Sequence, residues 1–216
     1  MATRGTPQTV GRNTLVLETL PRTRGVDVRD DLHWSGDPDE LDVLEVSYAR
    51  SPARILDDWR SALGTSPRRL VVLSLDRRPP RDRVHVDRAG CRVTIESANP
   101  HDLTEFGMRW QRALDRVDGP QAHPLVEFDS VTSMLQFVDV RTAYQFVHCI
   151  SAHVREIGAH AQFYLDPDAH EERVVQVFRS TVDDIRREES DGSSASRRDG
   201  GADGARSGAR NRGRPD

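Results

Sequence analysis

The stretch LVEFDSVTSMLQFVD, residues 125–139, joins an apolar run to a segment with helical spacing. The apolar run stops at Asp129 and Ser130, where a buried strand would end. An acid at that point is typical of strands that aim a carboxylate at a magnesium ion beside a bound nucleotide. The stretch therefore raises two questions: which fold surrounds it, and whether its acid binds a ligand.

Short β-rich runs alternate with helical segments through most of the chain. The runs are 14–17, 43–48, 70–75, 91–95, 125–128 and 161–165. Several are apolar on both faces, as in LVVLSL at 70–75, which is typical of strands buried in a parallel sheet. The alternation predicts right-handed βαβ crossovers. We therefore expect an α/β fold of three layers, an open, mainly parallel sheet with helices on both faces.

Four segments carry apolar residues at helical spacing. Ser51 and Pro52 supply an N-cap and a first-turn proline for the first. The next two cover 103–114 and 140–157. The last has its apolar face at 174–185, and we expect it to open at Asp166-Pro167.

Composition favours one globular domain in a chain of 216 residues, of which 36% are hydrophobic. We expect a flexible N-terminus at 1–12, the α/β domain at 13–188 and a disordered tail at 189–216, because the tail has no large apolar residue. Cys91 and Cys149 are the only cysteines, which predicts a reduced, cytoplasmic setting. No segment approaches the roughly 20 apolar residues that cross a bilayer, so we expect no membrane contact.

The pattern also resembles a known group of proteins. LVEFDSVTSMLQFVD, followed by AHAQFYLDPDAH at 159–170, resembles the C-terminal half of the RecA/KaiC-like ATPase fold, where a strand ends in Asp-Ser. From 13 to 185 the chain more closely resembles an uncharacterised haloarchaeal domain family related to KaiC and GvpD. The resemblance implies a P-loop NTPase fold and an ancestral site for ATP and magnesium.

Two parts of that ancestral site are missing from the sequence. Active ATPases place the lysine of a G-x-x-x-x-G-K-(S/T) loop on the phosphates. Here ETLPRTRGVDVRDDL at 18–32 has one glycine, and all 31 basic residues of the chain are arginine. Arg22 or Arg24 stays a candidate phosphate contact, against the alternative of a solvated loop of mixed charge. In KaiC-like relatives a catalytic glutamate follows the second strand, whereas VLEVSYARSP at 43–52 has Ala49 and Arg50 there.

Asp129 then has two interpretations. As a site residue it would hold a magnesium-bound water, with Ser130 adding a hydroxyl. As architecture, Asp129 or Ser130 would cap the following helix with no ligand. Because the phosphate loop is degenerate, we favour capping.

Other constellations are weaker. Cys149 and His153 share a helical face, and Asp166, Asp168 and His170 cluster after one strand, but their spacing does not supply the three or four converging ligands of a metal site. We therefore expect no metal. The densest basic patch comprises Arg77, Arg78, Arg81 and Arg83, and it lacks aromatic residues that would stack on bases.

The sequence therefore predicts a non-catalytic, regulatory or scaffolding protein, a pseudo-ATPase that acts through contacts with another protein, without a cofactor, as a monomer or dimer. One alternative is a nucleotide sensor or very slow NTPase that binds ATP and magnesium through Asp129 and an arginine. A second is nucleic-acid binding through the Arg77–Arg83 loop, which the net charge of -4 disfavours.

Overall fold

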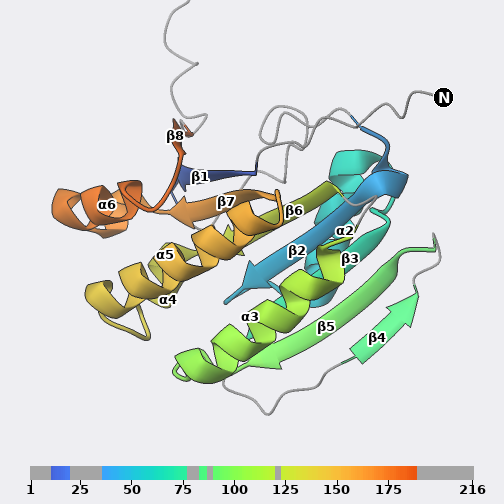
Figure 1. Cartoon of the computed structure of the whole chain (residues 1–216), viewed down its shortest axis with the longest axis horizontal. Helices are drawn as coiled ribbons and strands as arrows, with labels where there is room; N and C mark the ends of the chain where they lie inside the picture. The colour runs from blue at the N-terminus through green and yellow to red at the C-terminus, as the bar shows by residue number, and fades with distance from the viewer. Residues whose placement is uncertain (1–10, 20–35, 77–82, 87–89, 120–122, 189–216) are drawn as a thin grey trace, which may run out of the picture.

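The computed structural model describes residues 11–19, 36–76, 83–86, 90–119 and 123–188. In this part of the chain, eight strands form one sheet in the order β4-β5-β3-β2-β6-β7-β1-β8 (Figure 1). The strands are β1 Arg12–Leu17, β2 Leu41–Ser47, β3 Arg69–Leu75, β4 Arg83–Val86, β5 Arg92–Ala98, β6 His123–Asp129, β7 His160–Leu165 and β8 Asp184–Arg187. Every described pairing is parallel except that between β4 and β5, which is antiparallel.

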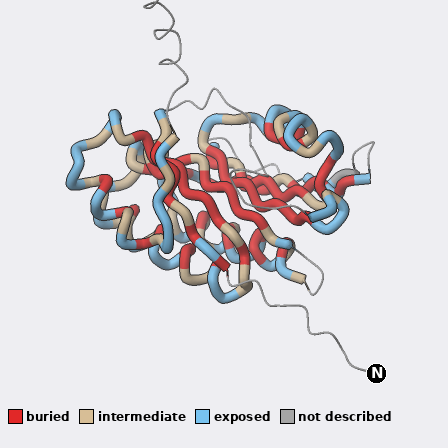
Figure 2. The backbone as a smooth tube through the Cα atoms, turned by 90° about the horizontal axis from the view of Figure 1, so that it is seen from above, coloured by how far each residue is buried: buried red, intermediate tan, exposed pale blue. Residues whose placement is uncertain are grey.

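Helices cover both faces of the sheet, and this confirms the predicted three-layer α/β architecture (Figure 1). The helical elements are η1 Pro38–Glu40, α2 Pro52–Leu63, α3 Leu103–Val117, α4 Val131–Met134, α5 Val140–Glu156, η2 Pro167–Ala169 and α6 Glu172–Arg179. Helices α3 to α6 share the larger hydrophobic core on one face, while α2 packs on the other through Ile55, Leu56 and Trp59. The strands between them are buried along most of their length (Figure 2). The arrangement is consistent with a RecA-like α/β fold.

The first three predicted helices form at the expected places. Ser51 caps α2 by accepting a hydrogen bond from the Arg54 N–H at 3.3 Å, with Pro52 in the first turn. The longer α5 begins after Asp139, whose carboxylate accepts from the Thr142 N–H at 2.9 Å. Each helix therefore starts where a short polar side chain satisfies a free backbone donor.

The prediction for the last helix is wrong at both ends. Asp166 caps the 3-10 turn η2 and not a long helix, and α6 begins only at Glu172. Its C-terminal end follows from two hydroxyls: Ser180 Oγ and Thr181 Oγ1 donate to the carbonyls of Val177 and Phe178 at 2.8 and 2.7 Å. The residues beyond that point turn to pair with β1, so 184–187 form the edge strand β8. Strands β4 and β8 were both missed by sequence reasoning.

Strand register brings the candidate residues to one edge of the sheet. Ser47, the last residue of β2, lies in register with Asp129, the last residue of β6. Asp166 directly follows β7, the other neighbour of β6. In parallel sheets this carboxyl edge is where ligands are bound.

Several predictions fall on residues that lie outside the described ranges. They concern Arg22, Arg24, most of the Arg77–Arg83 loop, residues 1–10 and the tail at 189–216. Arg12, placed by sequence in the N-terminal segment, already belongs to β1. Within the described ranges no helix combines the length and the apolar character that crossing a membrane requires.

Candidate functional site

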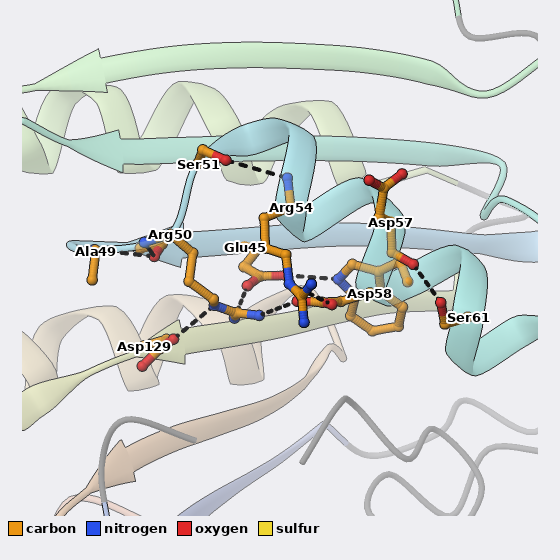
Figure 3. Close-up of polar contacts among 11 residues, drawn as sticks. Glu45, Ala49, Arg50, Ser51, Arg54, Asp57, Asp58, Ser61 and Asp129 are labelled. Atoms are coloured by element: carbon orange, nitrogen blue, oxygen red, sulfur yellow. Dashed lines mark hydrogen bonds and ion pairs between the residues drawn. The ribbon is translucent and has the colours of Figure 1, made fainter. Parts of the chain in front are cut away.

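The loop after β2 is folded by two serines. Ser47 Oγ accepts from the backbone N–H groups of Ala49 and Arg50 at 3.4 and 3.0 Å, which turns the chain back over the strand end. Ser51, one residue later, caps α2. Arg50 is thus held between two local hydrogen-bonded turns. Its side chain is directed across the carboxyl edge of the sheet toward β6 (Figure 3).

The Arg50 guanidinium contacts three carboxylates from three elements. Its Nε donates to Asp129 Oδ2 on β6 at 3.0 Å, and its Nη1 donates to Asp58 Oδ2 on α2 at 3.2 Å. Its Nη2 is hydrogen-bonded to Glu45 Oε1 on β2. A guanidinium presents donors in a planar fork, so it can engage several carboxylates where the ammonium of a lysine would act as one point. We call this set, Arg50 with Glu45, Asp58 and Asp129, the Arg50 cluster.

Glu45 is the buried member of the cluster. Its side chain is fully buried, and its second oxygen, Oε2, accepts from Trp59 Nε1 at 2.7 Å. A buried carboxylate without hydrogen bonds is costly, so Glu45 requires the donors that Arg50 and Trp59 supply. Arg54 places a second guanidinium beside the cluster, at the protein surface. Its Nε lies 3.0 Å from Asp58 Oδ1. Three carboxylates therefore meet two arginines at this edge.

Asp129 lies at the predicted strand end, but its partner was not predicted. Its side chain is largely buried and its Oδ2 is taken up by Arg50. A magnesium ion or an attacking water at Asp129 would have to compete with that guanidinium. Arg50 is a cation that neutralises its three carboxylate neighbours.

Helix capping is performed by Ser130 and not by Asp129. Ser130 Oγ accepts from the Ser133 N–H at 3.0 Å and its hydroxyl is 2.9 Å from Ser133 Oγ, while the Ser130 side chain is fully buried. Of the two residues expected as the cap, Ser130 therefore performs this role and Asp129 does not. Its carboxylate makes an ion pair across the sheet instead, and the shorter serine is the residue in register with the first free N–H groups.

We expect Ser130→Ala to lower the free energy of unfolding by about 1–2 kcal/mol, because α4 loses its N-cap in a buried position. Urea denaturation of both proteins measures the difference. Ser61→Ala is a matched control, because Ser61 is exposed on α2 and its hydroxyl donates only to the Asp57 carbonyl one turn earlier. An equal loss in the two variants would contradict the assignment of Ser130 as the cap.

The segment after β7 is tied to α4. Thr132 Oγ1 accepts from the Asp166 N–H at 2.9 Å and lies 3.1 Å from His170 Nε2. Burial lowers the pKa of the His170 imidazole, and the nearby Asp166 carboxylate offsets part of that change. A neutral imidazole can accept a hydrogen bond from the Thr132 hydroxyl. The Thr132 hydroxyl would then act both as the acceptor for the Asp166 N–H and as the donor to His170. These contacts connect the loops after β6 and β7.

Tyr48 begins an aromatic group beside the Arg50 cluster. Its ring stacks on Phe137 with centroids 5.7 Å apart and contacts Phe128 and Phe106 edge-on. Burial raises the pKa of the Tyr48 phenol above its ordinary value. The loop that carries Arg50 is therefore anchored by apolar packing as well as by hydrogen bonds.

The remaining predicted constellations do not converge. Among the residues that the structure describes, no group of three or more His, Cys, Asp or Glu is placed to hold a metal ion. Cys149 is exposed on α5 and Asp168 accepts a long hydrogen bond, 3.4 Å, from Thr19 Oγ1. Of the basic patch, Arg83 is described, as the exposed first residue of β4.

Sequence reasoning did not identify Glu45 and Asp58 as site residues, nor the role of Arg50. One local signal was available: LDVLEVS places two acids inside an otherwise apolar, buried strand. Such acids require cations or donors. The sequence does not say which of 31 arginines supplies them.

Comparisons with known proteins give a family without a described activity. A family profile described as a family of unknown function (DUF7504) matches residues 11–185. No protein of curated function matches the chain. Among solved structures, one from a structural study of Project ID PH0250 from Pyrococcus horikoshii OT3 is similar at 10% identity and a TM-score of 0.49, covering 82% of each chain. That degree of likeness has no bearing on function.

Proposed function

We propose that this chain, which belongs to the family of unknown function DUF7504, is a non-catalytic regulatory or scaffolding module acting through protein contacts. In this proposal it descends from a RecA/KaiC-like ATPase and keeps the fold without the reaction. The observation that supports it is the Arg50 cluster. The carboxylate best placed to serve a nucleotide-bound magnesium, Asp129, is bound by the guanidinium of its own chain at 3.0 Å.

Charge explains why this arrangement disfavours catalysis. A general base or magnesium ligand must offer a free carboxylate oxygen toward the reactants. Here the cation at position 50 lies between β2 and β6, and it is held there by Glu45 and Asp58 as well. Displacing it would leave the buried Glu45 without that partner, at a cost of several kcal/mol by the usual penalty for breaking a buried pair.

The binding of ATP with magnesium tests the proposal directly. We expect the melting temperature to be the same with and without MgATP, because a protein without a nucleotide site gains no stability from the ligand. A ligand at about 100 times its Kd stabilises the native state by about 2.7 kcal/mol, or about 5–10 °C for a chain of this size. Differential scanning fluorimetry resolves such a shift easily.

A shift with MgATP would support the nucleotide sensor instead. In that case Asp129→Asn should abolish the shift. Asp139→Asn is the matched control: it makes the same chemical change at a helix N-cap where asparagine also caps well. Loss of the shift in the first variant and its retention in the second would assign nucleotide binding to Asp129 and overturn the scaffold proposal.

A further inference from the structure

Strand β8 forms one edge of the sheet and pairs with β1 alone. Figure 1 shows it at the margin of the sheet, next to β1. No residue of β8 is buried, and its one apolar side chain, Ile185, is 41% exposed. An edge strand presents a row of main-chain N–H and C=O groups to which a further strand can pair.

The main-chain groups of Ile185 and Arg187 point away from β1. The Glu188 N–H donates to the Leu17 C=O at 2.9 Å, so the main chain at Glu188 faces β1. Main-chain groups alternate between the two sides of a strand, which directs those of Arg187 and Ile185 outward. In agreement, the Ile185 N–H donates to the carboxylate of Asp184, at 3.0 Å from Oδ1. A carbonyl of another strand can replace that local acceptor.

We propose that β8 pairs in antiparallel fashion with β8 of a second copy of this chain, with the two-fold axis at Ile185. In this register the two Ile185 residues form a hydrogen-bonded pair, in which each outward N–H donates to the C=O of the other copy. Their side chains meet across the axis, which removes exposed apolar surface from water. The two sheets then continue into one.

Charge selects this register among the symmetric ones. Residues paired across an antiparallel ladder share a face, so the axis must pass through a residue and not between two. With the axis at Ile185, Asp184 faces Arg186 of the second copy and Asp183 faces its Arg187. An axis at any of the other three residues of β8 would set a charged side chain against itself. Like charges directly opposite are destabilising, so Ile185 is the position in β8 that permits self-pairing.

The local ion pairs of β8 fit this arrangement. Arg12 Nη2 lies 3.1 Å from Asp184 Oδ2, and both side chains are exposed. Arg186 Nε lies 2.7 Å from Glu188 Oε1. With the axis at Ile185 these pairs join into one row of alternating sign, from Arg12 and Asp184 of one copy to Arg186 and Glu188 of the other. Charges on an edge strand ordinarily prevent pairing, whereas here their order makes the edge complementary to itself.

Sedimentation equilibrium of the full chain, at about 0.01–1 mM, tests the pairing. A short strand from each copy makes a small interface, so we expect a weak, reversible equilibrium between monomer and dimer. Asp184→Arg and Arg186→Asp should each raise the dimer Kd by about tenfold or more, because each sets like charges opposite each other twice. An equimolar mixture of these two variants should dimerise again, because two cations of one chain then meet two carboxylates of the other.

Ile185→Asp and Val84→Asp are a matched pair of variants. Each replaces an exposed apolar side chain on an edge strand, β8 in the first case and β4 in the second. Ile185→Asp should also raise the dimer Kd by about tenfold, because it sets two carboxylates against each other on the axis, and Val84→Asp should leave the Kd unchanged. Hydrogen exchange gives a second measurement: the Ile185 amide should exchange more slowly as the fraction of dimer rises.

The proposal is overturned if the parent chain stays monomeric over this concentration range, or if Ile185→Asp dimerises as the parent does. It is also overturned if Asp184→Arg and Arg186→Asp, both folded by circular dichroism, stay monomeric when mixed. A dimer that is lost in Val84→Asp and kept in Ile185→Asp would place the interface at β4 and overturn it as well. If one of the two arginine–aspartate exchanges prevents folding, Ile185→Asp and Val84→Asp decide the question by themselves.

This interface goes beyond the proposed function and does not rest on it, because none of its residues belongs to the Arg50 cluster. A melting shift in MgATP would overturn the scaffold proposal and leave the pairing of β8 intact. A monomeric chain would remove the interface and leave the scaffold proposal standing.

Discussion

Arg50→Met is expected to lower the free energy of unfolding by about 3–5 kcal/mol, the usual cost of removing one partner from a buried ion pair. Methionine retains much of the side-chain volume but supplies no donor. Glu45, fully buried, would lose the guanidinium, and Asp58 and Asp129 would lose the cation between them. Guanidinium chloride denaturation at neutral pH measures the loss.

Two further variants make this result specific to the Arg50 cluster. Arg54→Ala removes an arginine whose side chain is 72% exposed and pairs with Asp58, so its cost should stay below about 1 kcal/mol. Adding Glu45→Gln to Arg50→Met removes the buried charge itself and should restore part of the stability. If Arg50→Met were no more harmful than Arg54→Ala, the cluster would be a surface ion pair and not a structural connection.

Phe128→Ala is expected to cost about 3–5 kcal/mol, the usual range for deleting a fully buried aromatic side chain. Phe128 lies in β6 with no exposed surface, and its ring centroid is 5.6 Å from that of Phe163 and 6.2 Å from that of Phe106. Truncation would leave a cavity between the sheet and α3. Equilibrium urea denaturation provides the measurement.

Met108→Ala is a control for that loss, because a mostly exposed side chain on α3 should change stability by no more than about 0.5 kcal/mol. A loss below about 1 kcal/mol for Phe128→Ala would mean that the core around β6 collapses into the vacated space. It would then contradict the rigid packing of the aromatic rings on this face.

The fold could be predicted because it depends on periodic patterns. A run such as LVVLSL is apolar on both of its faces, so it must lie in a sheet that is covered on both sides. The alternation of such runs with helical segments leaves few possible sheet topologies. The prediction of the last helix was wrong because Val182 and Ile185 continue the apolar spacing of a helix. In the structure the hydroxyls of Ser180 and Thr181 end α6, and residues 184–187 pair with β1 as a strand. The spacing of apolar residues does not show whether a segment continues a local helix or pairs with a strand that is distant in the sequence.

The site was less predictable because its contacts are long-range. Asp129 and Ser130 were located correctly at the end of a strand, but the two roles were divided differently from the expectation. Arg50 and Asp129 are 79 residues apart, and only the parallel register of β2 with β6 brings them together. The two acids inside LDVLEVS do predict that cations are near; Asp42, for example, is bound by Arg68 at 2.8 and 2.9 Å. They do not identify which arginine is used.

The Arg50 cluster also constrains how the sequence can change. An acid at position 50 would stand beside Glu45, Asp58 and Asp129, so R50E would gather four carboxylates around one strand end. A mutational path to an acid at position 50 must therefore first neutralise Glu45 or bring in a second cation. Each of these two first steps is unfavourable while Arg50 is present. Once these three carboxylates surround position 50, an arginine there is therefore easier to keep than to replace by an acid.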